Sequence, residues 1–89
     1  MQLSKVLMYC TAACPFCRAA ERLLANKGVQ IDKIRVDLEP ALRAEMMRKS
    51  GGRRTVPQIW IGERHVGGCD DLYDLDRQGG LDALLRTQP

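Results

Sequence analysis

The sequence predicts an α/β fold, because helical and strand patterns alternate along its 89 residues. In the first half, the order strand, helix, strand, helix implies a parallel pair of strands joined by a right-handed crossover. In the second half, two short β-type runs flank a two-residue turn, which predicts a hairpin. A chain of this length has room for one compact domain, spanning residues 1–89, and we find no repeat or internal linker.

Four elements account for the first half of the chain. The apolar run 5–9 predicts a strand that is buried on both faces. A loop delivers Cys14 to the start of a helix, and Pro15 suits the first turn of that helix. From Cys17 to Lys27, small and apolar residues recur at helical spacing. Residues 29–36 alternate in part and predict a second strand. A second helix is expected from Pro40 to about Lys49, where a serine and two glycines follow.

The second half predicts a hairpin and two short helices. Residues 58–61 and 64–66 are the strand candidates, and Gly62-Glu63 forms the turn between them. A helix is expected to open at Asp70-Asp71, and residues 81–85 predict a short helix close to the C-terminus.

Composition excludes several classes of protein. Fourteen basic and 11 acidic residues give a net charge of +3, and only Arg53-Arg54 form an adjacent basic pair, so a nucleic-acid partner is not indicated. No apolar run approaches the ~20 residues that span a bilayer, and no signal-peptide pattern is present. We therefore expect a cytoplasmic monomer, in a compartment where catalytic disulfides are more common than structural ones.

The stretch Cys14-Pro15-Phe16-Cys17 is the strongest candidate for chemistry. Two thiols at this spacing can close a small disulfide ring or share a metal, and a place between a strand and a helix favours redox chemistry. A helix start offers free N–H groups and a positive dipole end, which favour a thiolate at Cys14. We therefore expect Cys14 to be the nucleophile and Cys17 the resolving thiol; a closed metal site or two inert buried thiols are the alternatives.

Two further motifs follow. Thr55-Val56-Pro57 precedes the hairpin, where the proline could simply start an edge strand. In Gly67-Gly68-Cys69-Asp70-Asp71, the glycines allow a close approach of backbone to a ligand. The helix start that follows them suits a carboxylate, although a helix cap alone would explain one of the two aspartates.

Together, in this order and spacing, the three motifs resemble those of the glutaredoxin family. The resemblance covers nearly the whole chain and is closest to the short bacterial dithiol class (glutaredoxin 3-like). The resemblance implies a thioredoxin fold, with a four-stranded mixed sheet in the order 2-1-3-4 flanked by helices. It also implies a glutathione-dependent thiol–disulfide oxidoreductase that reduces protein disulfides and glutathione mixed disulfides. Its partners would be glutathione, as co-substrate, and disulfide-containing or glutathionylated proteins, with no tightly bound cofactor and no metal.

The resemblance also implies roles for individual residues. Pro57 would follow a cis peptide bond and face the active-site thiols, and the Val56 backbone would pair with an extended peptide. The amides of Cys69 and Asp70 would bind the γ-glutamyl carboxylate of glutathione, and the side chain of Asp70 or Asp71 its amine. The full set of expected glutathione contacts is Phe16, Arg53, Thr55, Val56, Pro57, Gly68, Cys69, Asp70 and Asp71.

The chain departs from the family pattern at two positions. Phe16 stands where the family usually has tyrosine, and Thr11 where many members have lysine. Arg53 or Arg54 could replace that lysine against a glutathione carboxylate. No catalytic role is assigned to Cys69, and Cys10 is expected to be a small residue at the edge of the core.

Two other functions remain open at this point. One is a redoxin of the same fold that is reduced by a flavoprotein reductase. The other is an iron–sulfur cluster carrier, in which Cys14 of two subunits and glutathione hold the cluster. The second thiol, Cys17, and the proline after Cys14 weigh against the carrier.

Overall fold

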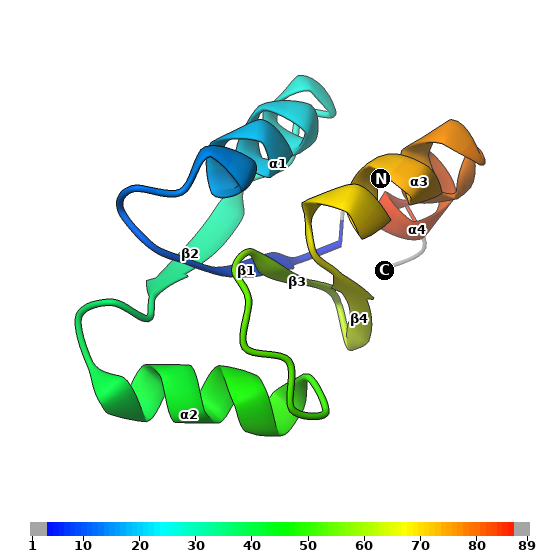
Figure 1. The fold of residues 1–89 in the computed structure, drawn as a ribbon. Coiled ribbons are helices and arrows are strands. Elements are labelled where there is room, and N and C mark those ends of the chain that lie inside the picture. Colours follow the sequence, from blue (N-terminus) through cyan, green and yellow to red (C-terminus); the bar gives the residue numbers. More distant parts are fainter. Residues whose placement is uncertain (1–3, 87–89) are drawn as a thin grey trace.

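The structure, a computed structural model, describes residues 4–86 and contains the predicted elements in the predicted order (Figure 1). In chain order they are β1 (Val6–Cys10), α1 (Pro15–Asn26), β2 (Ile31–Arg35), α2 (Pro40–Lys49), β3 (Gln58–Ile61), β4 (Arg64–Gly67), α3 (Cys69–Arg77) and α4 (Gly80–Leu85).

The strands form one mixed sheet in the order β2-β1-β3-β4, which confirms the predicted topology. β1 pairs in parallel with β2, so that Cys10 lies opposite Arg35, and antiparallel with β3. The hairpin partners β3 and β4 are also antiparallel. β1 therefore has a partner on each side, which agrees with its nearly continuous apolar sequence.

Several boundaries differ from the predicted ones by one or two residues. β1 spans Val6–Cys10, β4 extends to Gly67, and α4 begins at Gly80. β2 spans only Ile31–Arg35, because it pairs with the five residues of β1 and with no strand on its other side. The flanking valines, Val29 and Val36, are nonetheless buried. α3 begins at Cys69, one residue before the predicted start, because Gly68 takes the capping position.

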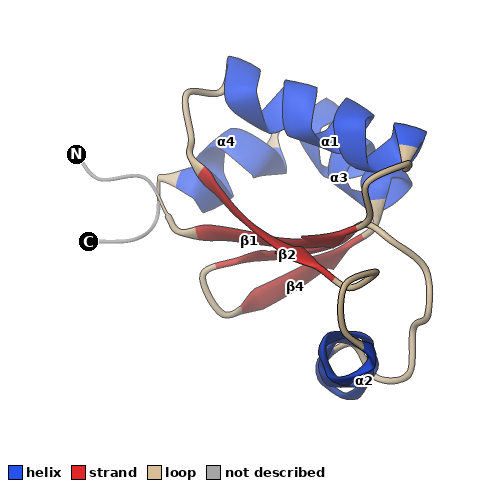
Figure 2. Ribbon diagram, turned by 90° about the vertical axis from the view of Figure 1, so that its left-hand side faces the viewer, coloured by secondary structure: helices blue, strands red, loops and turns tan. Residues whose placement is uncertain are grey.

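Helices cover the two faces of the sheet unequally (Figure 2). α1, α3 and α4 lie together on one face, and α2 lies alone on the other. Along β1, Val6, Met8 and Cys10 belong to the large core under the three helices, while Tyr9 belongs to a smaller core under α2. Cys14 and Cys17 are both part of the larger core. The Cys14–Cys17 pair thus lies at the edge of the layer that packs under the three helices.

The smaller core consists of Tyr9, Val36, Met46 and Trp60, with Met47 packed against it.

Within residues 4–86, no helix is long and apolar enough to cross a membrane.

Candidate active site

The backbone between β1 and α1 places Cys14 at the capping position of the helix. Cys14 is extended (φ −125°, ψ 102°), Pro15 starts the helix, and the first turn contains no acidic residue. The N–H of Cys17 donates a hydrogen bond to Cys14 Sγ over 3.1 Å. The sulfur of Cys14 therefore occupies the positive end of α1, where a backbone donor stabilises the thiolate.

The loop before β3 forms the other side of Cys14. Its thiol lies 3.8 Å from the carbonyl oxygen of Val56, to which it donates a weak hydrogen bond. The Val56–Pro57 peptide bond is cis, as the resemblance implied. Cys14 and Cys17 are both free thiols, so the geometry is that of the reduced dithiol.

Cys14 and Cys17 differ little in exposure. Their exposed fractions are 7% and 4%. Burial raises the pKa of Cys17 to about 12, and its hydrogen bond with Cys14 adds to that effect. Cys17 is therefore a thiol at neutral pH, whereas Cys14 has a backbone donor in place to stabilise its negative charge. The two thiols are distinguished by their hydrogen bonds rather than by their exposure.

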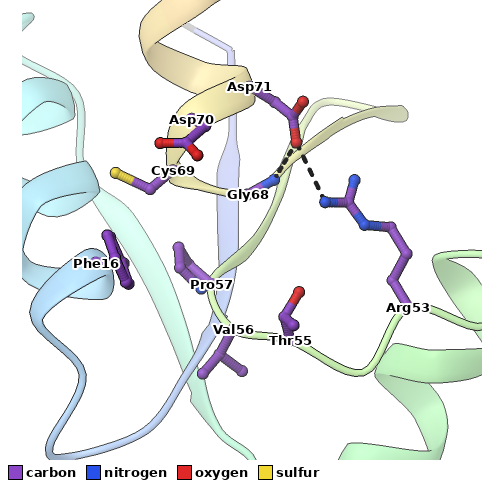
Figure 3. Close-up of a pocket in the computed structure, with 9 residues that line it drawn as sticks. All are labelled: Phe16, Arg53, Thr55, Val56, Pro57, Gly68, Cys69, Asp70 and Asp71. Atoms are coloured by element: carbon purple, nitrogen blue, oxygen red, sulfur yellow. Dashed lines mark hydrogen bonds and ion pairs between the residues drawn. The ribbon is translucent and has the colours of Figure 1, made fainter.

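A cleft of about 400 Å³ lies beside Cys14 and between the starts of α1 and α3 (Figure 3). The residues that line it are those predicted as glutathione contacts: Phe16, Arg53, Thr55, Val56, Pro57, Gly68, Cys69, Asp70 and Asp71. Phe16 is 62% exposed, and its ring forms one wall of the cleft. Three segments far apart in the sequence thus meet at one opening.

The start of α3 is organised by Asp71. Its carboxylate accepts a hydrogen bond from the N–H of Gly68 over 2.9 Å and lies 3.3 Å from the Arg53 guanidinium (Figure 3). The Gly68 N–H, and after it Arg53, hold the pKa of Asp71 below its ordinary value against the opposing effect of burial. Asp71 therefore caps its own helix. Both aspartates are exposed, but only the Asp71 carboxylate is engaged by Gly68 and Arg53.

The two glycines before α3 allow this arrangement. Gly67 has φ +117°, and a methyl group there would overlap the Asp71 carboxylate. A methyl group on Gly68 would lie 3.3 Å from the carbonyl oxygen of Pro57, a tight contact. The turn into α3 can therefore pack closely against the Pro57 loop only without side chains at these positions.

Of the two arginines considered as replacements for the family lysine, the structure places Arg53 in the cleft. The backbone carbonyl of Arg54 instead accepts a hydrogen bond from Arg43 over 3.0 Å. Thr11 lines a separate cavity of about 350 Å³, together with Cys10 and Cys17. Cys10 is 4% exposed, as expected for a core residue, and burial raises its pKa.

Sequence reasoning missed a supporting residue, Gln58. Its side chain is fully buried and donates to the carbonyl oxygen (3.0 Å) and hydroxyl (3.2 Å) of Thr55. Its amide oxygen lies 2.8 Å from His65 Nε2. Gln58 thereby fixes the loop that carries Val56 and Pro57. The signal in the sequence is an amide within the otherwise apolar strand 58–61, since a buried amide needs partners.

Comparison with known proteins agrees with this geometry. The family model for glutaredoxin matches residues 6–66. The chain belongs to the glutaredoxin family. It is 60% identical over 80 residues to a glutaredoxin of Pseudomonas aeruginosa, covering 90% of this chain and 94% of that protein. It is 49% identical over 84 residues to glutaredoxin 3 of Escherichia coli K12, covering 94% of this chain and all of the relative.

Among solved structures, the chain is similar to a buckwheat glutaredoxin crystallised as a glutathione complex. The TM-score is 0.84 at 29% identity, over 92% of this chain and 76% of that one. Family and fold together make this chain a thiol–disulfide oxidoreductase. Within residues 4–86, no three His, Cys, Asp or Glu side chains are grouped so that they could hold a metal ion.

Proposed function

We propose that this chain is a glutathione-dependent oxidoreductase that reduces protein disulfides and glutathione mixed disulfides through Cys14 and Cys17. One observation contributes most to the proposal: Cys14 Sγ accepts a backbone N–H at the start of α1 while contacting Val56, which lines the cleft. A nucleophile and a site for a small co-substrate are therefore adjacent.

With a glutathione mixed disulfide, the Cys14 thiolate attacks the glutathione sulfur. The substrate leaves as a thiolate and takes up a proton, and Cys14 becomes disulfide-bonded to glutathione. A second glutathione thiolate attacks the glutathione sulfur of this intermediate, which releases glutathione disulfide and the Cys14 thiolate. This cycle does not use Cys17.

With a protein disulfide, the Cys14 thiolate attacks one sulfur and breaks the substrate S–S bond. The other substrate cysteine leaves as a thiolate and takes up a proton, and Cys14 forms a mixed disulfide with the cysteine it attacked. Cys17 then gives up its proton and attacks Cys14 Sγ, so that the substrate leaves and the Cys14–Cys17 disulfide forms. Two glutathione molecules reduce that disulfide by successive exchange. The raised pKa of Cys17 keeps it protonated until the intermediate forms, and the departing substrate thiolate can take up the proton.

The charged groups of glutathione complement the polar groups that line the cleft. Its γ-glutamyl carboxylate is assigned to the first amides of α3, at Cys69 and Asp70, which have no acceptor within the helix. Its amine is assigned to Asp70, because the Asp71 carboxylate already accepts from Gly68 and pairs with Arg53. The buckwheat relative solved with glutathione supports the choice of ligand.

The test compares two electron sources and one variant. Wild type should turn over a glutathionylated substrate with glutathione and glutathione reductase, and should not be reduced by a flavoprotein thioredoxin reductase. Cys17→Ser should keep deglutathionylation and lose reduction of protein disulfides. Turnover with the flavoprotein alone would refute the glutathione proposal, and a brown protein on anaerobic purification would instead support cluster binding.

A further inference from the structure

Two large apolar side chains are prominently exposed in the described part of the chain. They are Phe16, 62% exposed, and Leu38, 67% exposed. Phe16 lines the glutathione cleft, and the proposed function therefore uses it. Leu38 lies outside that cleft, in the loop between β2 and α2, and nothing described so far uses it.

The topology brings Leu38 close to the nucleophile. β1 and β2 are parallel, so their carboxyl ends meet at one edge of the sheet, where Val36 N–H donates to Cys10 C=O over 3.0 Å. The chain continues from one strand into the Cys14 loop and from the other into the Leu38 loop (Figure 1). The two loops therefore start side by side.

Asp37 connects these loops and holds Leu38 in place. Its carboxylate accepts two hydrogen bonds of 2.7 Å from Arg35 and one of 3.4 Å from the N–H of Ala12. The Leu38 N–H in turn donates to the carbonyl of Arg35 over 3.4 Å. The Arg35 guanidinium holds the pKa of Asp37 well below its usual range, with a further contribution from the Ala12 N–H. The connection therefore persists at any pH near neutral.

The surface formed by Ala12, Ala13 and Leu38 is here named the apolar shelf. Its three residues are exposed, and none of them is among the residues that line the glutathione cleft. Ala12 is two residues from Cys14, so the shelf begins within roughly 7 Å of the nucleophile along the backbone. From Ala12, the 3.4 Å contact with Asp37 and one further residue lead to Leu38, a path of about 10–15 Å from Cys14. A substrate chain rising ~3.3 Å per residue would cover that path in three or four residues from its reactive cysteine.

We propose that the apolar shelf binds a segment of the substrate protein, and that Leu38 selects substrates with an apolar side chain three or four residues from the reactive cysteine. The inference rests on the proposed function, because it requires a substrate disulfide on Cys14. The occupant is a protein segment because the substrate must lie across Cys14, and glutathione is assigned to the cleft beside it.

The experiment uses two peptides, each glutathionylated at a single cysteine. One has leucine and the other serine at the third and fourth positions on both sides of that cysteine. Glutathionylated cysteine, which has no flanking residues, is the reference substrate. Turnover is measured in the glutathione-coupled assay for wild type, Leu38→Ser, Leu38→Met and Glu63→Ser. Glu63 is exposed and lies in the β3–β4 turn, so it controls for a surface change elsewhere.

Wild type, Leu38→Met and Glu63→Ser should prefer the leucine peptide by about 3- to 10-fold in kcat/KM, the range for partial burial of one apolar side chain. Leu38→Ser should lose this preference and keep its rate on glutathionylated cysteine, which also shows that it is folded. A preference that persists in Leu38→Ser, or is missing from wild type, would overturn the inference. Failure of wild type on glutathionylated cysteine would refute the proposed function and this inference with it.

Discussion

Helices α1 and α3 both begin at the same cleft, but their first turns use the positive end of the helix differently. The first turn of α1 contains no carboxylate, and its capping group is the sulfur of Cys14. The first turn of α3 contains Asp70 and Asp71, and Asp71 accepts the N–H of Gly68, the residue that caps that helix. In the proposed function, one helix start therefore stabilises its own nucleophile, and the other would present amides and a carboxylate to a ligand with both charges.

This difference indicates that the residues of the first turn, more than the helix itself, decide which group a helix N-terminus binds or stabilises. An acidic residue in the first turn of α1 would compete with the thiolate for the same donors. At α3, the acidic residues are compatible with the proposed function, because glutathione would offer an amine as well as a carboxylate.

The largest expected effect comes from removing the sulfur at the start of α1. Cys14→Ser should lower turnover of glutathionylated substrates by at least about a thousandfold, because a hydroxyl is a far weaker nucleophile than a thiolate. The glutathione-coupled assay measures this directly. Cys10→Ser, a change at a buried thiol that lines a different cavity, should retain activity. Comparable losses in both variants would show that general damage, rather than the nucleophile, was measured.

Alkylation should separate the two active-site thiols. At pH 7, iodoacetamide should modify Cys14 and leave Cys17, because burial raises the pKa of Cys17 to about 12 and keeps it almost entirely protonated. Since raising the pH ionises a thiol, modification of Cys17 should increase steadily as the pH approaches 12. Peptide mass spectrometry of the reduced protein identifies the modified cysteine. Equal rates at pH 7 would contradict the assignment of roles.

At the start of α3, Gly67→Ala should disturb both stability and ligand binding. An alanine held at this positive φ should lower the free energy of unfolding by about 1–3 kcal/mol. Its methyl group would also displace the Asp71 carboxylate. Gly52→Ala is a matched control, since Gly52 also has a positive φ (+98°) but open space around its Cβ position. Urea unfolding should show a loss in both variants, whereas the KM for glutathione should rise in Gly67→Ala alone.

The smallest effects should distinguish the two aspartates. Asp70→Asn should raise the KM for glutathione about 3- to 10-fold with little change in stability, as expected when an exposed charge-assisted hydrogen bond is lost. Asp71→Asn should instead lower the free energy of unfolding, by about 0.5–1 kcal/mol at pH 7. The reverse pattern, in which Asp71→Asn has the larger KM effect, would reassign the amine contact to Asp71.

The effect of Asp71 on stability should depend on pH. Because its pKa is lowered in the folded state, its stabilisation is present above the ordinary carboxyl pKa of about 3.9 and is lost as the pH falls through the lower folded value. Urea unfolding at pH 7 and pH 3 should therefore show a smaller acid-induced loss in Asp71→Asn than in wild type.

Much of this arrangement could be predicted from local patterns. Pro15 and the apolar spacing after it place a helix start at Cys14, and Gly62-Glu63 identifies the hairpin, because both signals depend on neighbouring residues only. The strand order and the joint cleft were implied by the resemblance of three motifs, not by any periodicity. The role of Gln58 was not predicted, because its contacts with Thr55 and His65 require the loop before β3 and the hairpin to be folded against each other.

The sequence by itself determined the elements, their order and the unequal placement of Cys14 and Cys17 on the first turn of a helix. Tertiary structure decided the longer-range partners: Asp71 with Arg53, Gln58 with His65, and Asp37 with Ala12. The physical reason is that helix starts and turns depend on residues a few positions apart. Which partner a charged or amide side chain binds depends on the groups that the folded sheet brings within hydrogen-bonding distance.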